Sequence, residues 1–375
     1  MIYLNNAATS WPKPESVYTS LNFHTRSFGA GFGRGNDKHS EISSGIIYDC
    51  RCAAAGLFGI NCPERIIFTQ NATDSINMAL KGLLKNGDHV IVSSTEHNSV
   101  MRPLVKMKNS GIIDYSVADC STEGKTHPES IRKLIQKNTA LVSLIHTSNV
   151  TGTTNDIEAI GNECTKAGIP FMVDASQSAG IYDIDVIRDG ISILAMPGHK
   201  GLLGPQGTGL LYIAPSINPD TIREGGTGSF SKNLLQPDDL PDKLESGTQN
   251  FPAIAALLEG IRFINKMKTA TIRSHLFELT EMIRTELRRI SAINEFGDTE
   301  NPSSIFSFNI DGIDTSEIGT YLADKDISVR GGFHCSFMAH KHYGTLNSGM
   351  IRISPGIFTV SSEIQSFIKI LKKIF

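Results

Sequence analysis

The chain has 375 residues, of which 40% are hydrophobic and 19% are charged, a composition typical of a globular protein with a sizeable core. Its net charge of −3 argues against a nucleic-acid partner, and the lack of a polybasic patch or long apolar run argues against a membrane partner. The N-terminal sequence lacks the charged start and apolar stretch of a signal peptide, so we expect a cytoplasmic protein.

Short apolar runs alternate with helical patterns over much of the chain. We predict strands at 65–69, 89–93, 141–145, 170–174 and 191–195, with helices at 74–84 and 156–167 between them. Continuous apolar strands separated by helices indicate a mainly parallel sheet that is covered on both faces. The fold class is therefore α/β.

The pattern changes after residue 250. Two amphipathic helices are predicted at 253–268 and 275–291, a half-exposed alternating strand at 304–310 and a closing helix at 361–373. We therefore expect a large domain over 21–250 and a smaller α+β C-terminal domain over 251–375. Residues 1–20 are expected to form an N-terminal segment that packs on the small domain.

Polar residues follow each predicted strand, where open α/β sheets bind their ligands. Asp174 closes an apolar strand, so it needs either a cation or a helix N-terminus to cap. Lys200 closes the next strand, beside a glycine-rich turn. Ala72 and Thr73 open a helix, which indicates a phosphate site, although a simple helix cap explains these two residues equally well. A lysine amine, an acid and phosphate donors are what pyridoxal 5'-phosphate (PLP) requires.

Other motifs are weaker. The glycines of 29–33 lack the spacing of a dinucleotide-binding fingerprint, and those after Lys200 lack the spacing of a P-loop. The six cysteines form no C-x-x-C pair, which argues against a disulfide framework, and we expect most of them to be buried. A zinc site at His334, Cys335, His340 and His342 is an alternative, but the spacing lacks a second close pair, so we expect no metal.

Six motifs occur in order at 95–97, 146–152, 173–177, 198–200, 245–250 and 330–335. With them the chain resembles the class V aminotransferase family of fold-type I PLP enzymes, in its cysteine desulfurase and selenocysteine lyase branch. The resemblance covers nearly the whole chain. It implies a large domain with a mainly parallel sheet flanked by helices, and a smaller C-terminal domain that carries a cysteine loop.

The resemblance also implies how PLP is held. Lys200 would form the Schiff base, Asp174 would pair with the pyridinium, and His97 would stack on the ring and shuttle protons. The ring hydroxyl and the phosphate would be bound by Asn149, Gln177, Ala72, Thr73, His199 and Thr227. Thr227, in the glycine-rich segment 225–228, would come from a neighbouring subunit, which implies a homodimer with shared active sites.

The implied reaction converts L-cysteine to L-alanine. Cys335 would accept the sulfur as a persulfide and pass it to an acceptor protein or a small thiol. Arg352 would grip the substrate carboxylate with a bidentate guanidinium, and the remaining substrate contacts would come from Ala7, Asn149 and Arg330. Two positions depart from the family pattern, because Pro197 replaces a frequent serine and Asn36-Asp37 stands where relatives often have a histidine.

Three alternatives remain open. A selenocysteine lyase would share the fold and act on L-selenocysteine. A transaminase or C–S lyase of the same family would leave Cys335 without a role. A non-enzymatic PLP-binding or sulfur-carrying protein is disfavoured, because Lys200, Asp174, His97 and Arg352 are all present. The sequence does not identify the sulfur acceptor or the pathway.

Overall fold

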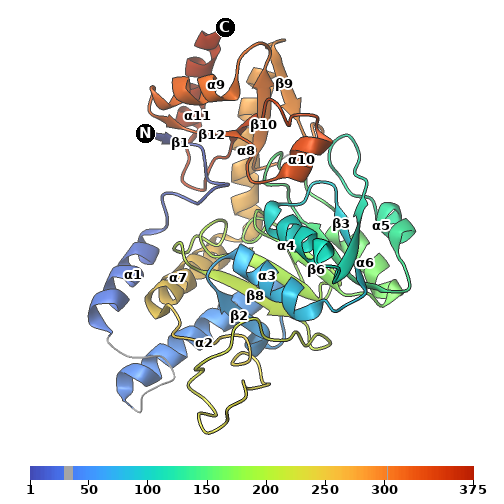
Figure 1. The fold of residues 1–375 in the computed structure, drawn as a ribbon. Coiled ribbons are helices and arrows are strands. Elements are labelled where there is room, and N and C mark those ends of the chain that lie inside the picture. The colour runs from blue at the N-terminus through green and yellow to red at the C-terminus, as the bar shows by residue number, and fades with distance from the viewer. Residues whose placement is uncertain (29–36, 302) are drawn as a thin grey trace.

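The centre of the fold is a sheet with the strand order β2-β8-β7-β6-β5-β3-β4, seen near the middle of Figure 1. It comes from a computed structural model that describes residues 1–28, 37–301 and 303–375. The strands are β2 (Ile66–Thr69), β3 (Asp88–Ser93), β4 (Ile113–Ala118), β5 (Thr139–Ile145), β6 (Phe171–Asp174), β7 (Ile193–Pro197) and β8 (Gly209–Ile213). All five predicted strands of this sheet are present.

β8 is antiparallel to both of its neighbours, β2 and β7, and the other adjacent pairs in this sheet are parallel. The mainly parallel sheet predicted from the sequence is therefore confirmed. β4 and β8 were not predicted. β8 returns beside β7, the preceding strand of the chain, which is the arrangement that a short connection between strands favours.

Helices cover both faces of this sheet, as the prediction requires. Alternate residues within a strand point to opposite faces, so Phe171 and Val173 contact one apolar core while Met172 contacts the other. The first core is covered by α2 (Lys38–Phe58), α5 (Pro128–Leu134), α6 (Ile157–Ala167) and α7 (Phe251–Met267), and the second by α3 (Ala72–Leu83) and α4 (Asn98–Asn109).

A second, antiparallel sheet lies in the C-terminal part of the chain, with the order β12-β13-β10-β9. Its strands are β9 (Ile293–Phe296), β10 (Phe306–Ile310), β12 (Arg330–Gly332) and β13 (Met350–Ile353). It shares an apolar core with α8 (Thr269–Leu287), α9 (Thr315–Ala323) and α11 (Ser361–Leu371). The short helix α10 (Phe337–His342) follows β12, and 3-10 turns occur at Pro63–Arg65 and Lys372–Ile374.

The prediction that 304–310 is half exposed was wrong. Phe306 and Phe308 are buried in the C-terminal core, and Ser307, on the opposite face of β10, is buried as well. The Ser307 hydroxyl donates to the carbonyl oxygen of Val150, which follows β5. This strand is therefore enclosed because its polar face packs against the large sheet's loops.

The N-terminal residues lie beside the C-terminal sheet. β1 (Ile2–Tyr3) pairs in parallel with β11 (Ile327–Ser328), and Leu4 belongs to the C-terminal core. The next helix, α1 (Glu15–Ser27), packs against α7 at the lower left of Figure 1. α7 itself packs on α2 and contributes to the core of the large sheet. The division at residues 20 and 250 stays a prediction.

Some predictions concern residues at the edge of the described part of the chain. The glycines of 29–33 and Asn36 lie outside the described residues, whereas Asp37 is the N-cap of α2 and accepts hydrogen bonds from the N–H groups of His39 (2.9 Å) and Ser40 (3.1 Å). Within the described residues, no helix combines the length and apolar character of a membrane span.

The prediction that most cysteines are buried was wrong, because only Cys50 and Cys164 are. Cys62 and Cys335 are exposed, since each lies in a loop outside the apolar cores. The remaining two, Cys52 and Cys120, have intermediate exposure.

Candidate active site

Residues that follow five strands of the large sheet line one pocket at the carboxyl edge of that sheet. The pocket contains the predicted residues Ala72, Thr73, His97, Asn149, Asp174, His199 and Lys200, with Asn71, Ser99, Ile145, Ser176 and Pro197. The predicted clusters meet because the strands that carry them are parallel and end at the same edge.

Asp174 ends β6 and is 1% exposed. One carboxylate oxygen, Oδ1, accepts a hydrogen bond from the N–H of Ser176 at 2.9 Å. No lysine, arginine or histidine among the described residues lies within ion-pair distance of this carboxylate. A buried carboxylate without a cation is costly, so this position calls for a positively charged ligand.

Lys200 lies three residues beyond β7 and is half-buried. Its amine has no hydrogen-bond partner among the described residues. Burial and the positive charge of Arg352 lower its pKa from 10.5 to about 8, while the Asp174 carboxylate acts in the opposite direction. A lysine with a lowered pKa is a better nucleophile at neutral pH, because more of its amine is uncharged.

His97 is the N-cap of α4, and its Nδ1 accepts hydrogen bonds from the Ser99 N–H at 3.0 Å and the Ser99 hydroxyl at 2.7 Å. An accepting Nδ1 carries no proton, so the proton of the neutral ring is on Nε2. Burial lowers the pKa of His97 to about 4, against the effect of Asp174. The ring is therefore neutral at physiological pH.

The N-terminus of α3 opens onto the same pocket. Asn71 caps the helix by accepting from the N–H of Asp74 at 3.0 Å, which leaves the N–H groups of Ala72 and Thr73 without a partner inside the helix. Backbone N–H groups at a helix start bind phosphate well. The hydrogen bond of His199 Nδ1 to the Thr9 hydroxyl, at 3.1 Å, fixes the His199 ring beside the pocket.

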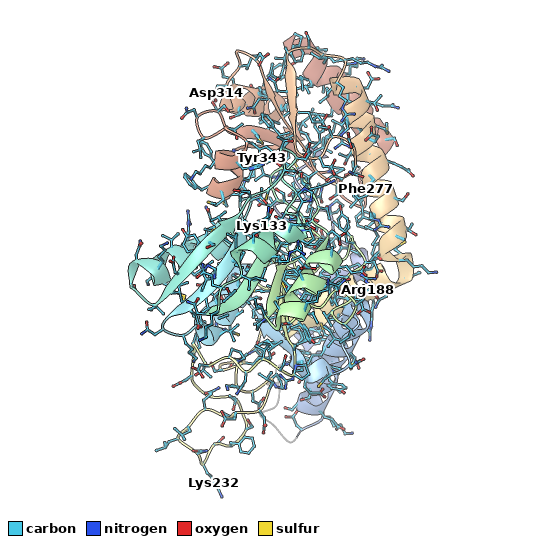
Figure 2. The ribbon with its side chains drawn as sticks, turned by 90° about the vertical axis from the view of Figure 1, so that its right-hand side faces the viewer. Lys133, Arg188, Lys232, Phe277, Asp314 and Tyr343 are labelled. Atoms are coloured by element: carbon cyan, nitrogen blue, oxygen red, sulfur yellow. The ribbon has the colours of Figure 1, made fainter. Side chains whose placement is uncertain are left out.

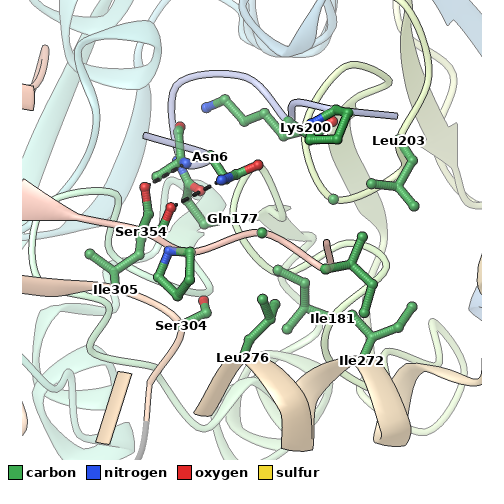
Figure 3. Close-up of a pocket in the computed structure, with 17 residues that line it drawn as sticks. Asn6, Gln177, Ile181, Lys200, Leu203, Ile272, Leu276, Ser304, Ile305 and Ser354 are labelled. Atoms are coloured by element: carbon green, nitrogen blue, oxygen red, sulfur yellow. Dashed lines mark hydrogen bonds between the residues drawn. The ribbon is translucent and has the colours of Figure 1, made fainter. Parts of the chain in front are cut away.

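A second pocket lies on another side of Lys200 and contains the predicted residues Ala7 and Gln177 (Figure 3). Gln177 Nε2 donates to the carbonyl oxygen of Ala7 at 2.9 Å, and the N–H of Ala7 donates to the Ser354 hydroxyl at 2.9 Å. The N-terminal segment is thus tied both to the large sheet and to the residue that follows β13.

Arg352, in β13, is 1% exposed and has no carboxylate partner among the described residues. Its Nη1 donates to the carbonyl oxygen of Asn149 at 2.6 Å and its Nη2 to Asn5 Oδ1 at 3.3 Å, while its Nε is buried without a partner. Burial and the neighbouring Arg330 lower the pKa of Arg352. This site is therefore suited to an anionic ligand.

Cys335 lies in the loop between β12 and α10. Its thiol is exposed and lies 3.4 Å from Nη2 of Arg330, whose Cα pairs with that of Arg352 across the sheet. The structure thus places the predicted sulfur acceptor beside Arg330.

Thr227 lines neither pocket, and the same is true of the predicted site residues Arg330, Cys335 and Arg352. The Thr227 hydroxyl contacts the Ser229 hydroxyl at 3.0 Å. The contribution of Thr227 to a neighbouring subunit stays a prediction.

The zinc alternative has no structural support. Among the described residues, no three histidine, cysteine, aspartate or glutamate side chains gather as metal ligands would. His334 Nε2 bonds with the carbonyl oxygen of Met350 at 3.0 Å, and His340 Nδ1 bonds with the Thr345 hydroxyl at 2.8 Å.

Sequence reasoning missed three neighbours of the site. Glu96 is buried, its Oε1 accepts from the N–H of Ile145 at 2.8 Å, and burial raises its pKa to about 8. Asn5 contacts Arg352, and the N–H of Asn98 donates to the carbonyl oxygen of Cys335 at 3.0 Å. Glu96 stands in the recognised motif 95–97 and Asn98 follows that motif directly, which was the available signal for these two residues.

Comparison with known proteins agrees with this geometry. Probable cysteine desulfurases from Methanothermobacter thermautotrophicus and Borreliella burgdorferi are each 31% identical to the chain over its full length, covering 94% and 92% of the respective relatives. The apo structure of a cysteine desulfurase from Thermococcus onnurineus NA1 superimposes with a TM-score of 0.89 at 27% identity, covering 100% of this chain and 94% of that one. The family model for class-V aminotransferases matches residues 2–367. The chain therefore belongs to the class-V aminotransferase family.

Proposed function

We propose that the protein is a PLP-dependent cysteine desulfurase, which converts L-cysteine to L-alanine and transfers the sulfur through Cys335 to an acceptor thiol. The observation that carries this proposal is the exposed Cys335 thiol, which lies 3.4 Å from Nη2 of Arg330, a residue paired across the sheet with the buried Arg352. The names of the similar proteins support the same activity.

The pocket residues fit PLP. Asp174 is a buried carboxylate without a cation, as a partner of a protonated pyridine nitrogen requires. Lys200 has an amine of lowered pKa, and the start of α3 has free N–H groups for a phosphate. Asn149 Oδ1 is buried without a partner on the wall of the same pocket. Bound PLP would supply an electron sink for the α-carbon of an amino acid.

The chain's own residues supply binding and proton transfer. Lys200 would hold the cofactor at rest and, once displaced by the substrate amine, take the α-proton. Asp174 would keep the pyridine nitrogen protonated. Arg352, which lacks an anionic partner, would bind the substrate carboxylate through two N–H groups. The neutral His97 would lie against the ring with its Nε2 proton available for a hydrogen bond.

The sulfur step requires a thiolate. The Sγ of Cys335 would attack the sulfur of the substrate, forming an S–S bond as the Cβ–S bond breaks. The electron pair of that bond stays with the carbon fragment, which takes up protons and leaves as L-alanine. The guanidinium of Arg330 lies 3.4 Å from the Sγ of Cys335. A thiol of the acceptor then attacks the outer sulfur and restores Cys335.

The Cys335→Ala variant tests this function. It should lose cysteine desulfuration almost completely yet keep substantial selenocysteine cleavage, because the weaker C–Se bond breaks without an accepting thiolate. Alanine, sulfide and selenide would be measured with L-cysteine and L-selenocysteine for the wild type, for Cys335→Ala and for a Cys62→Ala control, which removes the other exposed cysteine.

Mass spectrometry of the wild type after reaction with L-cysteine should find one added sulfur on the Cys335 peptide. A Cys335→Ala variant that desulfurates cysteine at the wild-type rate, or a persulfide on another cysteine, would contradict the assignment and favour a C–S lyase. Formation of a keto acid in place of alanine and sulfide would favour a transaminase. Preference for L-selenocysteine in the wild type would favour a selenocysteine lyase.

A further inference from the structure

Two consecutive residues of the cysteine loop, which is the segment 333–336 between β12 and α10, have an unusual backbone conformation. His334 has a φ of 49° and Cys335 a φ of 60°, both in the left-handed region that residues other than glycine rarely adopt. Such a conformation persists only where the surrounding structure holds it. The contacts that hold this loop therefore decide where the Cys335 thiol lies.

Two hydrogen bonds fix the carbonyl groups of these residues. Asn149 Nδ2 donates to the carbonyl oxygen of His334 at 2.7 Å, and the N–H of Asn98 donates to the carbonyl oxygen of Cys335 at 3.0 Å. Asn149 follows β5 and Asn98 begins α4, so both donors belong to the large sheet and its helices, whereas the cysteine loop follows β12 of the C-terminal sheet.

Asn149 is 5% exposed and touches two further parts of the site. Its carbonyl oxygen accepts from Arg352 Nη1 at 2.6 Å, and its Oδ1 has no partner on the wall of the pocket that contains Lys200. The orientation of its amide follows from chemistry, because the carbonyl oxygen of His334 can only accept and Nδ2 is the only donor of the side chain.

We propose that Asn149 is a positioning residue, whose amide holds His334 and Cys335 in their left-handed conformation and thereby couples the Lys200 pocket and Arg352 to the placement of the thiol. The meaning of this coupling for catalysis rests on the proposed function, in which Cys335 accepts the sulfur. The hydrogen bond and the conformation that it holds do not depend on that assignment.

Gln177 provides a matched control. It is also a buried amide beside Lys200, and the family resemblance gives it the same role toward the ring hydroxyl as Asn149. Its Nε2, however, donates to the carbonyl oxygen of Ala7 at 2.9 Å, and no hydrogen bond joins it to the cysteine loop within the described residues. Asn149→Ala and Gln177→Ala therefore both remove an amide beside the pocket, but only Asn149→Ala frees the loop.

Hydrogen exchange of the PLP-loaded enzyme would test the contact directly. In Asn149→Ala, the backbone amides of residues 333–336 should exchange about tenfold faster than in the wild type, because one buried hydrogen bond is lost. Asn149→Asp should show at least the same effect, since a carboxylate oxygen would face the His334 carbonyl. Gln177→Ala should match the wild type. Unchanged exchange in both Asn149 variants, or equal acceleration in Gln177→Ala, would overturn the proposal.

A second measurement separates positioning from cofactor binding. The α-proton exchange of L-alanine needs the cofactor and Lys200 but no thiol, whereas persulfide formation from L-cysteine needs both. In Asn149→Ala the rate of persulfide formation should fall about tenfold further than that of α-proton exchange, while in Gln177→Ala the two should fall together. Equal losses in Asn149→Ala would overturn the coupling.

The two proposals fail in different ways. If Cys335 is not the sulfur acceptor, Cys335→Ala should desulfurate cysteine normally. That result does not depend on the hydrogen exchange measured for the Asn149 variants. If Asn149 does not position the loop, the hydrogen exchange of residues 333–336 should be unchanged in the Asn149 variants, although the enzyme still forms its persulfide on Cys335.

Discussion

At the scale of single residues, burial and the charges around Lys200 together set how readily its amine reacts. Burial is the largest cause of its lowered pKa, and Arg352 and Asp174 act in opposite directions. An amine with a pKa of about 8 is roughly one-tenth uncharged at pH 7, whereas an ordinary lysine is almost entirely protonated. The site therefore provides a usable nucleophile near neutral pH.

We predict a pH dependence for the attachment of PLP to the cofactor-free protein. Because the neutral amine is the nucleophile, the rate should rise about tenfold per pH unit below the Lys200 pKa and level off above about 8. Stopped-flow absorbance of the cofactor measures this rate of attachment at each pH. Arg352→Gln should move the midpoint to higher pH and Asp174→Asn to lower pH, since the two charges act oppositely.

Lys13 provides the control for this prediction. It is also partly buried, and burial lowers its pKa to about 8, but it lines neither pocket that contains Lys200. Lys13→Ala should therefore keep the absorbance band of the covalent complex, which Lys200→Ala should lose. A band that survives in Lys200→Ala would show that another amine holds the cofactor.

At the scale of elements, a buried ion pair connects α2 to the segment that precedes α7. Arg51 Nη2 lies 2.6 Å from Glu245 Oε2, and both side chains are 4% exposed. The other carboxylate oxygen accepts from the N–H of Phe68 at 2.6 Å, and the guanidinium lies 4.5 Å from the centre of the Phe68 ring. The pair thus ties this segment to β2, whose end leads into the start of α3.

Arg51→Ala should lower the free energy of unfolding by about 3–5 kcal/mol, because it leaves the Glu245 carboxylate buried without a cation. Denaturant-induced unfolding measures the loss. The exposed pair of Lys85 and Asp220 is the comparison, and Lys85→Ala should change the free energy of unfolding far less, because both partners of that pair are solvated. A change below about 1 kcal/mol in Arg51→Ala would show that the buried pair does not stabilise the fold.

At the scale of the whole molecule, a loop projects far from the rest of the chain. Figure 2 shows Lys232 at its tip, well away from the two sheets. Phe230, Leu234 and Leu235 lie on this loop and are 64%, 104% and 76% exposed. A group of large exposed apolar side chains is typical of a surface that contacts another protein. Thr227 lies three residues before Phe230, so a second copy of the chain that covered the loop would receive Thr227 as well.

Mixed dimers test whether Thr227 acts across subunits. One chain would carry Lys200→Ala and the other Thr227→Ala. If each active site combines Lys200 of one chain with Thr227 of the other, one site is doubly damaged and the second is intact, so tightly bound PLP and activity should persist at about half the wild-type level. Activity and PLP retention of separately tagged, co-purified dimers measure this.

If each site uses its own Thr227, both sites of the mixed dimer are damaged and no fully normal site remains. Homodimers of each variant provide the controls, because neither contains an intact site in any arrangement. A mixed dimer without a normal site, once its formation has been verified, would contradict the shared active site.

The sequence by itself determined the class of fold and most of the residues around the cofactor pocket. Contiguous apolar runs and the polar residues that end them are local features, and parallel strands necessarily bring their ends to one edge. Asp174 and Lys200 could therefore be placed in one site without knowledge of the packing, and the ordered motifs identified the family.

Only the tertiary structure decided how the parts of the site contact one another. The burial of β10 depends on loops of the large sheet, and the Asn149–His334 hydrogen bond joins residues that are 185 positions apart. Neither feature can be read from a local sequence pattern, because each arises from contacts between residues that are far apart in the sequence. The same holds for Arg352, whose lack of an anionic partner becomes evident only when its surroundings are folded. These long-range contacts, rather than the motifs, hold the cysteine loop and Arg352 against the loops of the large sheet.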